Sequence, residues 1–278
     1  MRPIVALTLL WPAWVSGQTP AMPDATTASA QAIATALLDV RNDQKAREAL
    51  AKESSPRAVA VVTALVAGLP DDADEEYRRI PWIWRVAVAA GRAKDEAALR
   101  PLLDVAMPRE GQPLRDWQAV VLGGGVVMGI SQAGAWPGEV LAPWLAEDAA
   151  RATRWSRSLQ LATTMADDAT VRNGTRYDAL RMLAVLPWER VGAQLTRYLA
   201  ADVDAELQLG AIGALSDLQD ARAADSLIGH FPGYAADNRR HAVNALLRTE
   251  ARRARLRQAL TQGIVRDEWL TPEQRQKL

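Results

Sequence analysis

The 278-residue chain has no cysteine, only two histidines and one phenylalanine, and its 33 basic side chains are balanced by 33 acidic ones. The absence of cysteine excludes disulfides, cysteine-ligated zinc, covalent c-type haem attachment and a thiol nucleophile. His230 and His241 lie far from any Glu-rich helical face and do not form a zinc motif, so we expect neither a metal nor another cofactor. A net charge of zero provides no overall field toward nucleic acid or an anionic membrane.

The apolar residues that are present, 49% of the chain, are mostly Ala, Leu and Val, while aromatic residues make up 5%. Ala and Leu have high helix propensity, and Ala lets helix backbones approach closely. The composition therefore favours helices packed against helices, with enough apolar material for a substantial core.

The first 28 residues have the composition of an export segment. A single positive charge at Arg2 precedes an apolar run of about 12 residues, which is too short for an ordinary membrane span, and Val15 and Gly17 are small residues before a cleavage site. We therefore predict a signal peptide at 1–17, a disordered Pro/Ala/Thr-rich leader at 18–28, and a periplasmic or secreted protein with no membrane span after signal removal. The alternative is that 4–15 forms a buried first helix.

From Thr26 onward, apolar residues recur at helical spacing between breaks of Gly, Pro or Asp and Asn, and no run alternates as a strand would. We predict an all-α protein. The expected helices cover 28–40, 43–52, 57–69, 75–79 with 82–93, 96–105, 114–130, 138–146, 149–165, 170–186, 189–200, 205–216, 221–230, 238–248 and 251–262.

The C-terminal part of the chain contains an internal repeat. The segment Ala-Leu-Arg-Met-Leu at 179–183 is echoed at 211–215 and again at 242–246, and Leu195 recurs as Leu227, which gives offsets of 32, 31 and 32 residues. Two helices in such a period are typical of an α-solenoid, whose units bury their apolar faces against neighbouring units. We predict HEAT-like helical hairpins in a right-handed superhelix, with regular repeats of about 32 residues at 170–278 and divergent ones at 29–169.

Ten tryptophans are many for a chain with one phenylalanine, and six of them fall in the middle of the sequence. Tryptophan combines a large apolar area with one hydrogen-bond donor, so such a group can line a surface that binds a partner. The alternative is that these rings wedge irregular helix pairs together in the core. The six are Trp82, Trp84, Trp117, Trp136, Trp144 and Trp155.

Three consecutive glycines, Gly123 to Gly125, fall inside the predicted helix 114–130, where each costs about 1 kcal/mol relative to alanine. Close contact with a neighbouring helix would compensate for that cost. A phosphate-binding loop is the alternative, but it needs a strand before the glycines and a Lys, Ser or Thr after them, and the sequence has neither.

Seven arginines against one acid between Arg239 and Arg257 raise the possibility of a nucleic-acid surface. On the helix from Ala251, however, Arg252, Arg253, Arg255 and Arg257 spread over more than half the circumference. We interpret them as a solvated surface and expect no nucleic-acid partner.

Two segments resemble a known group of proteins. Residues 76–86 (EYRRIPWIWRV) and 112–121 (QPLRDWQAVV), together with the end of the chain from Leu256 to Arg275, are similar to the helical segment of planctomycete-type exported multidomain haem-binding proteins. In that family a propeller resembling sugar dehydrogenases, a HEAT-repeat region and a cytochrome c domain follow one another. The resemblance implies a HEAT fold and export, while the missing propeller and haem-attachment cysteines imply that this chain carries no electron-transfer residue.

We predict that the protein is a non-catalytic scaffold that binds another exported protein. The sequence does not predict its oligomeric state. One alternative is an accessory helical module that docks a dehydrogenase or a c-type cytochrome through its Trp-rich middle. The other is a solenoid enzyme, glycosylase- or lyase-like, which requires a cleft that combines Trp117 or Trp155 with Asp116 or Asp167. No residue pattern of a catalytic site is present, since the serines lack a nucleophile-elbow setting and a nearby histidine.

Overall fold

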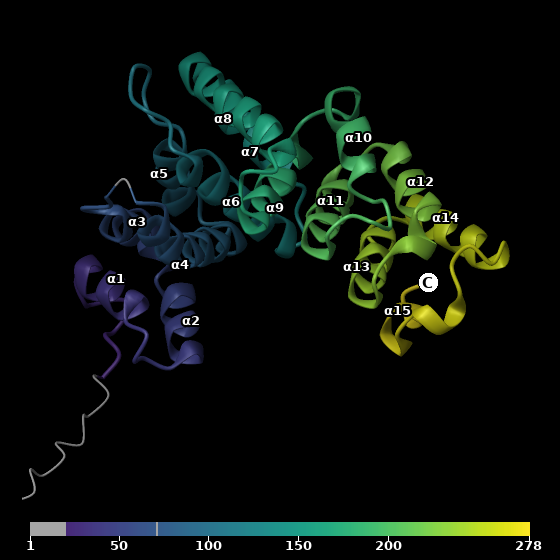
Figure 1. Cartoon of the computed structure of the whole chain (residues 1–278), viewed down its shortest axis with the longest axis horizontal. Helices are drawn as coiled ribbons and strands as arrows, with labels where there is room; N and C mark the ends of the chain where they lie inside the picture. The colour runs from purple at the N-terminus through teal and green to yellow at the C-terminus, as the bar shows by residue number, and fades with distance from the viewer. Residues whose placement is uncertain (1–20, 71) are drawn as a thin grey trace, which may run out of the picture.

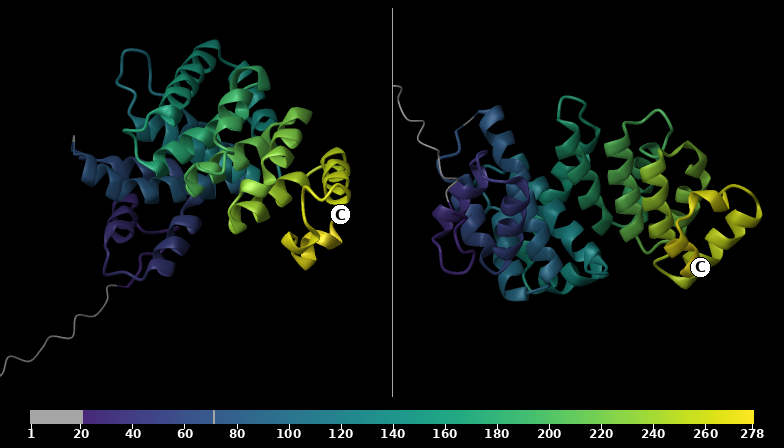
Figure 2. Two further views of the ribbon diagram at one scale, coloured as in Figure 1. Left: turned by 45° about the vertical axis from the view of Figure 1, so that its right-hand side comes forward. Right: turned by 90° about the horizontal axis from the view of Figure 1, so that it is seen from below.

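The computed structural model describes residues 21–70 and 72–278, and every regular element in these residues is a helix. This confirms the all-α prediction. The helices follow one another along the long axis of the molecule in chain order, as Figure 1 and the right-hand view of Figure 2 show. The predicted signal peptide at 1–17 lies outside the described residues.

The helices of the N-terminal half are mostly joined by short turns. They are α1 (Ala30–Leu38), α2 (Gln44–Glu53), α3 (Ala58–Val66), α4 (Ala73–Ala93), α5 (Glu96–Ala106), α6 (Gly123–Gln132), α7 (Pro137–Ala146) and α8 (Ala149–Asp167). A short 3₁₀ segment, η1 (Ser55–Arg57), precedes α3, and a π-helical segment, η2 (Trp117–Leu122), runs directly into α6.

The C-terminal half continues the same alternation of helix and short turn. Its helices are α9 (Asn173–Met182), α10 (Trp188–Arg197), α11 (Ala205–Asp217), α12 (Ala221–Gly229), α13 (Ala236–Leu246), α14 (Glu250–Thr261) and α15 (Pro272–Gln276). Three 3₁₀ segments lie between them, namely η3 (Leu183–Val185), η4 (Phe231–Gly233) and η5 (Asp267–Trp269). Each range expected from the sequence contains a helix, and α15 lies beyond the last of these ranges.

Short polar side chains begin many of these helices by accepting hydrogen bonds from free backbone N–H groups of the first turn. Asp204, for example, accepts from the N–H groups of Glu206 and Leu207 at the start of α11. Thr271 and Gln274 form a reciprocal capping box at α15. The same role is played by Ser29, Asp43, Asp72, Asp95, Asp148, Asp220 and Thr249.

Helix α4 is continuous where the sequence predicted two helices, at 75–79 and 82–93. It runs through Pro81, which cannot donate a backbone hydrogen bond. Buried contacts made by Trp82, Ile83 and Val86 hold the second part of the helix in place, and the Pro81 carbonyl accepts a hydrogen bond from Arg85. Tertiary packing therefore overrides the local tendency of proline to end a helix.

The helices pack in two rows. In the first row, α4, α6, α9, α11 and α13 contact one another in that order. In the second row, α1, α3, α5, η2 and α8 form one series of contacts, and α10, α12 and α14 form another. Consecutive helices such as α8 and α9, α11 and α12, and α13 and α14 link the rows.

The internal repeat seen in the sequence occupies equivalent positions in the first row. Its three copies lie in α9 with η3, in α11 and in α13, and their Ala and Leu, Ile or Val side chains are buried between neighbouring helices of that row. Leu195 and Leu227 are fully buried at matching positions of α10 and α12. The repeated residues are thus those that fill the contacts between successive helix pairs.

Hydrogen bonds and ion pairs also join residues that are one sequence period apart. Several such pairs are separated by 30 to 33 residues, so these polar links connect one helix pair to the next. They include Thr163–Gln194, Asp167–Arg197, Glu189–Arg222, Gln208–Asn238, Ser216–Arg248 and Asn244–Gln274.

The three consecutive glycines allow α6 to lie against two helices at once. A Cβ atom on Gly124 would lie 2.7 Å from the Asp178 carbonyl oxygen of α9, and one on Gly125 would lie 2.8 Å from the Ala87 Cβ of α4. These distances are shorter than van der Waals contact. The prediction of close helix contact at the glycines is confirmed, and none of them forms a loop.

The described part of the predicted leader at 18–28 packs against the helices. Asp24 accepts hydrogen bonds from the backbone N–H groups of Thr26 and Thr27, which folds the chain into a turn. Arg57 donates to the carbonyls of Ala25, Thr26 and Ala28, and Ala25 is buried. A single arginine 29 residues further along the chain from Ala28 therefore holds this segment against the helices, which local composition does not reveal.

Candidate binding groove

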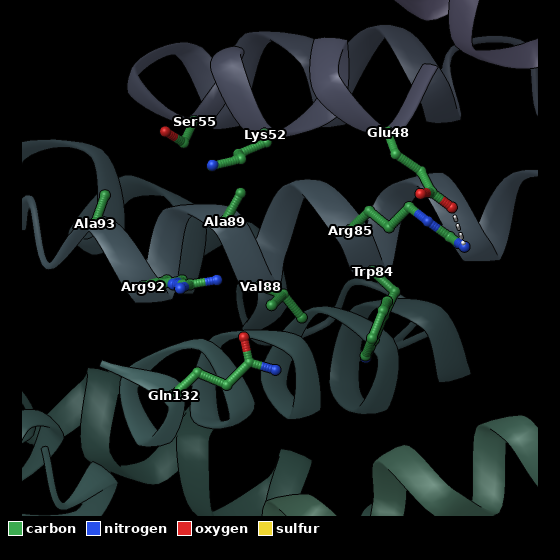
Figure 3. A pocket seen from close by; sticks show the side chains of 10 residues that line it. All are labelled: Glu48, Lys52, Ser55, Trp84, Arg85, Val88, Ala89, Arg92, Ala93 and Gln132. Atoms are coloured by element: carbon green, nitrogen blue, oxygen red, sulfur yellow. Dashed lines mark hydrogen bonds and ion pairs between the residues drawn. The ribbon is translucent and has the colours of Figure 1, made fainter. Parts of the chain in front are cut away.

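A cavity of about 490 Å³ lies between α2, α4 and the end of α6 (Figure 3). Figure 3 shows Glu48 and Lys52 reaching over it from α2, with Trp84, Val88 and Arg92 on the α4 side. The Arg85 guanidinium is turned toward Glu48, with 3.3 Å between Nη2 and Oε1. The cavity combines an apolar floor with charged edges, and we call it the first cavity.

A second cavity, of about 400 Å³, lies between α4, α9 and α11. Aromatic rings and acidic groups dominate its walls, together with Gly174 and a few apolar side chains. The aromatic residues are Tyr77, Trp84 and Tyr177, and the acids are Asp178 and Glu206.

A third cavity, of about 540 Å³, extends along α6, α9, α11 and α13. Its polar side chains are basic or uncharged, and they include Ser131, Arg181, His241, Asn244 and Arg248. Burial and the neighbouring Arg240 lower the pKa of His241 below its usual value, so the imidazole is neutral at neutral pH.

The three cavities adjoin one another because they share wall residues. Trp84 and Arg85 line both the first and the second cavity, and Tyr177 and Leu209 line both the second and the third. Gln132 belongs to the first and the third. Together the cavities follow the first row of helices from α4 to α13, and we call this surface the groove.

Behind the third cavity, a buried carboxylate fixes two arginines of its wall. The Asp217 side chain is inaccessible to solvent, and its Oδ2 lies 2.6 Å from the Arg181 Nη2. Its Oδ1 accepts hydrogen bonds from Arg248 and from the Ser131 hydroxyl. A buried carboxylate between two guanidinium groups compensates part of the cost of removing all three charges from water, and it sets the position of the guanidinium groups at the groove.

Gly213 makes room for the Arg181 side chain, since a Cβ atom there would lie 1.9 Å from its Nη1. The Arg181 Nε atom is buried and has no hydrogen-bond partner in the described residues. Arg181 is therefore held by one strong ion pair and by shape.

Asp178 is a second buried acid, in the wall of the second cavity, and it has no ion-pair partner in the described residues. It is 5% exposed, and its Oδ1 is buried without a well-formed hydrogen bond, as is the Nε1–H of Trp84. Burial raises the pKa of the Asp178 carboxyl well above its usual value, while the Trp84 indole and Arg181 act in the opposite direction. A carboxyl in this setting holds its proton to a higher pH than an exposed one.

The six tryptophans proposed as a partner surface do not lie together on one face. Four of them are core side chains with exposed fractions of 4% to 6%, which favours the alternative that they wedge helix pairs together. The four are Trp82, Trp117, Trp144 and Trp155. Trp84 alone of the six lines the groove, and Trp136 lines a different cavity, beside Arg252 and Arg255.

Arginine stacking explains why several tryptophans lie close to the surface and are still covered. The Arg47 and Arg85 guanidinium groups both lie over the Trp82 ring, at 4.8 and 5.1 Å, and Arg248 lies 4.0 Å from the centre of Trp136. Such cation–π contacts place the rings at the boundary of the core.

The arginine-rich segment 239–257 is also not a solvated surface throughout. Arg252 is 5% exposed and donates hydrogen bonds to the carbonyls of Leu215, Ser216, Leu218 and Ala245. Burial lowers the pKa of Arg252 to about 10. The guanidinium group satisfies carbonyls at the C-terminal ends of α11 and α13, which are free of intrahelical partners. The arginines of segment 239–257 therefore include one that stabilises helix ends as well as others that carry surface charge.

The described residues contain no group of three or more His, Asp or Glu side chains that could hold a metal ion. Trp117 and Trp155, which the enzyme alternative needs in a cleft, are core residues, and Asp167 pairs with Arg197 at 2.8 Å.

No helix in the described part of the chain is both long and apolar enough to cross a membrane.

Comparison with known proteins returned no family model, no curated protein and no solved structure that matches this chain.

The acids of the groove were not singled out from the sequence. Asp178 immediately precedes the repeated segment of α9, and Asp217 follows that of α11 by two residues. The one available signal is positional, since a charged residue next to the buried face of a helix is rarely free of a structural or functional role.

Proposed function

We propose that the protein is a HEAT-type α-solenoid with a right-handed superhelix, and that it is a non-catalytic scaffold whose groove binds a segment of another exported protein. A periplasmic or secreted location follows from the predicted signal peptide. The proposed domain organisation keeps regular repeats at 170–278 and divergent ones at 29–169.

Two observations support the solenoid. The helices of the first row contact one another in chain order, and so do those of the second row from α10 to α14. Several polar links connect residues 30 to 33 positions apart, as expected when each repeat contacts only its neighbours. In the N-terminal half the equivalent close contacts are further apart, since Gly91 meets Gly129 38 residues later, in keeping with longer units there.

The observation that carries the binding proposal is the continuity of the groove. Three cavities with shared walls follow one row of helices, and each offers apolar surface beside polar groups that can fix the direction of a ligand. An elongated site of this shape suits an extended polypeptide better than a compact metabolite. The buried Asp217 and Arg181 pair keeps one wall rigid in advance of binding.

A narrower version of this proposal is that the bound partner is a redox protein. It rests on the resemblance of 76–86 and 112–121 to the helical segment of exported haem-binding proteins. One detail supports it, because segment 76–86 contributes Tyr77, Trp84 and Arg85 to the groove.

The test is capture of partners from the exported fraction of the native host with the tagged full-length chain and two variants. Val88→Arg, in the first cavity, and Leu209→Arg, between the second and third, should each remove the captured protein, because a charged side chain fills the apolar wall. Gln160→Arg, on the exposed face of α8, is the matched control and should capture as the unchanged protein does. Capture that is insensitive to both groove variants would overturn the proposal, and haem absorbance of the captured material decides for or against a cytochrome.

A further inference from the structure

We infer that the second cavity of the groove is a subsite for a lysine side chain of the bound partner, with its ammonium group between three aromatic rings and two carboxyl groups. The side chains concerned are Tyr77, Trp84, Tyr177, Asp178 and Glu206. The inference rests on the proposed function of the groove and specifies the chemistry of its ligand.

Asp178 provides the first argument, because it is a buried acid that lacks a cation. Its side chain lines the cavity, is 5% exposed, and forms no ion pair or well-formed hydrogen bond in the described residues. A buried carboxyl without a partner is destabilising, and native proteins keep few of them. An ammonium group bound in the cavity supplies the missing partner.

Glu206 provides the second carboxyl and is also unpaired within the described residues. The Glu206 carboxylate and the Tyr77 hydroxyl both lie near Gly174. A Cβ atom on Gly174 would lie 3.2 Å from the Tyr77 hydroxyl and 3.8 Å from the Glu206 Oε1. The hydroxyl and the carboxylate therefore converge over a residue without a side chain, which leaves space for a ligand group between them.

The aromatic walls suit a cation because the faces of Tyr and Trp rings carry negative electrostatic potential. Tyr77 already accepts a cation in the structure, since the Arg172 guanidinium lies 4.0 Å from its ring centre. Arg172 is not part of the cavity wall. The rings of Trp84 and Tyr177 remain available on the groove side.

Cations of the protein do not fill the subsite. Arg85 is the one basic residue in the described wall of this cavity, and it pairs with Glu48 and donates to the Pro81 carbonyl. Arg181 lies on the same helix as Asp178, but its Nη2 is bonded to Asp217. Within the described residues, no basic side chain therefore pairs with Glu206 in this wall.

An ammonium group fits better than a guanidinium group. A guanidinium fork binds best to two carboxylate oxygens presented side by side, and the Asp178 Oδ1 is buried. An ammonium nitrogen has three donors on one atom, which suits separate acceptors in one cavity wall such as Asp178, Glu206 and the Tyr77 hydroxyl.

The test uses butylammonium as a probe of the lysine side chain, with butanol and propylguanidinium for comparison, on the full chain. The indole N–H resonance of Trp84 in ¹H–¹⁵N spectra, assigned from its loss in Trp84→Phe, reports binding. It should move saturably with butylammonium, more weakly with propylguanidinium and not with butanol. An equal shift with butanol would overturn the inference.

Three variants refine the test. Asp178→Asn should weaken butylammonium binding by about tenfold, because it removes a charge-assisted hydrogen bond while preserving shape. Gly174→Ala should also weaken it without any change of charge, by narrowing the space beside Tyr77. Asp225→Asn, an exposed acid outside the groove, is the control and should leave binding unchanged. Unchanged binding in Asp178→Asn would contradict the subsite.

The outcomes also separate this inference from the proposed function. If partner capture depends on Val88 and Leu209 while butylammonium does not bind, the groove stands and the lysine subsite is wrong. If butylammonium binds as expected and no partner depends on the groove, the subsite stands and the scaffold proposal fails.

Discussion

Gly91 of α4 and Gly129 of α6 meet at the crossing of the two helices, and a Cβ atom on Gly129 would lie 2.8 Å from the Gly91 Cα and 2.2 Å from the Val88 carbonyl oxygen. A Cβ on Gly91 would in turn lie 2.5 Å from the Val126 carbonyl oxygen. The two backbones are therefore in direct contact. This crossing sets the distance between α4 and α6, and with it the width of the first cavity.

Gly129→Ala should destabilise the protein, because the added methyl group must push the two backbones apart. Overpacking of this kind costs roughly 1–3 kcal/mol, and the gain in helix propensity offsets about 1 kcal/mol of that. We expect a net loss of about 1 kcal/mol, and of about 2 kcal/mol at most, in the free energy of unfolding, measured by urea denaturation. Gly138→Ala in α7 is the matched control, because a Cβ there meets nothing within 4 Å. Equal stability of Gly129→Ala and Gly138→Ala would rule out the close crossing.

Asp217→Asn should cost about 3 kcal/mol, because it leaves the buried Arg181 and the partly buried Arg248 without their shared anion. Thermal and urea unfolding both report this loss. The comparison is Asp237→Asn, whose carboxylate is 77% exposed in its pair with Arg240 and should change stability by less than about 0.5 kcal/mol. Similar effects from the two substitutions would mean that the buried cluster does not stabilise the fold.

Asp178→Asn should stabilise the protein at neutral pH by about 1 kcal/mol or more, since it removes an acid that the fold buries without a partner. The pKa of this carboxyl is raised in the folded state above the ordinary value of 3.8. Between those two pKa values the folded state binds more protons than the unfolded state, so the stability of the unchanged protein falls as pH rises. The advantage of the variant should therefore be small near pH 3 and grow above about pH 4, in urea denaturation as a function of pH. A constant difference across this range would contradict the pKa direction.

Asn238→Ala should weaken the connection between successive repeats. Asn238 is buried and donates 2.9 and 2.8 Å hydrogen bonds to the Ala205 carbonyl and to the Gln208 Oε1, 33 and 30 residues earlier. Its removal leaves buried acceptors unpaired and should cost about 2 kcal/mol in urea denaturation. Gln258→Ala on the exposed face of α14 should be neutral, and a neutral Asn238→Ala would show that the polar links contribute little.

The helices were predictable because their signals are local. Apolar spacing, capping aspartates and the Ala-rich repeat at 179–183, 211–215 and 242–246 depend on residues within one or two turns of each other, and the structure contains a helix in every expected range. Pro81 is the exception. The sequence around Pro81 predicts a break between two helices, but the burial of Trp82 and Ile83 keeps α4 continuous.

The site was much less predictable, because the properties of its residues depend on distant parts of the chain. Trp117 and Trp155 look like binding residues in the sequence and are core residues, while Trp136 is covered by arginines more than 100 positions away. Asp178 and Asp217 gain their character from burial and from partners such as Arg248, which periodicity alone does not identify.

Site-specific photo-cross-linking is the most direct test of a groove that binds a polypeptide. A benzoylphenylalanine is placed at one position per variant of the tagged chain, which is then irradiated in the exported fraction of the native host. The groove positions are Val88, Leu209 and Asn244, and the positions outside it are Gln160, Arg190 and Asp225. We predict that the three groove positions cross-link to one and the same protein and that the outside positions do not. Cross-linking of a partner from the outside positions alone, or from no position in the groove, would contradict the account.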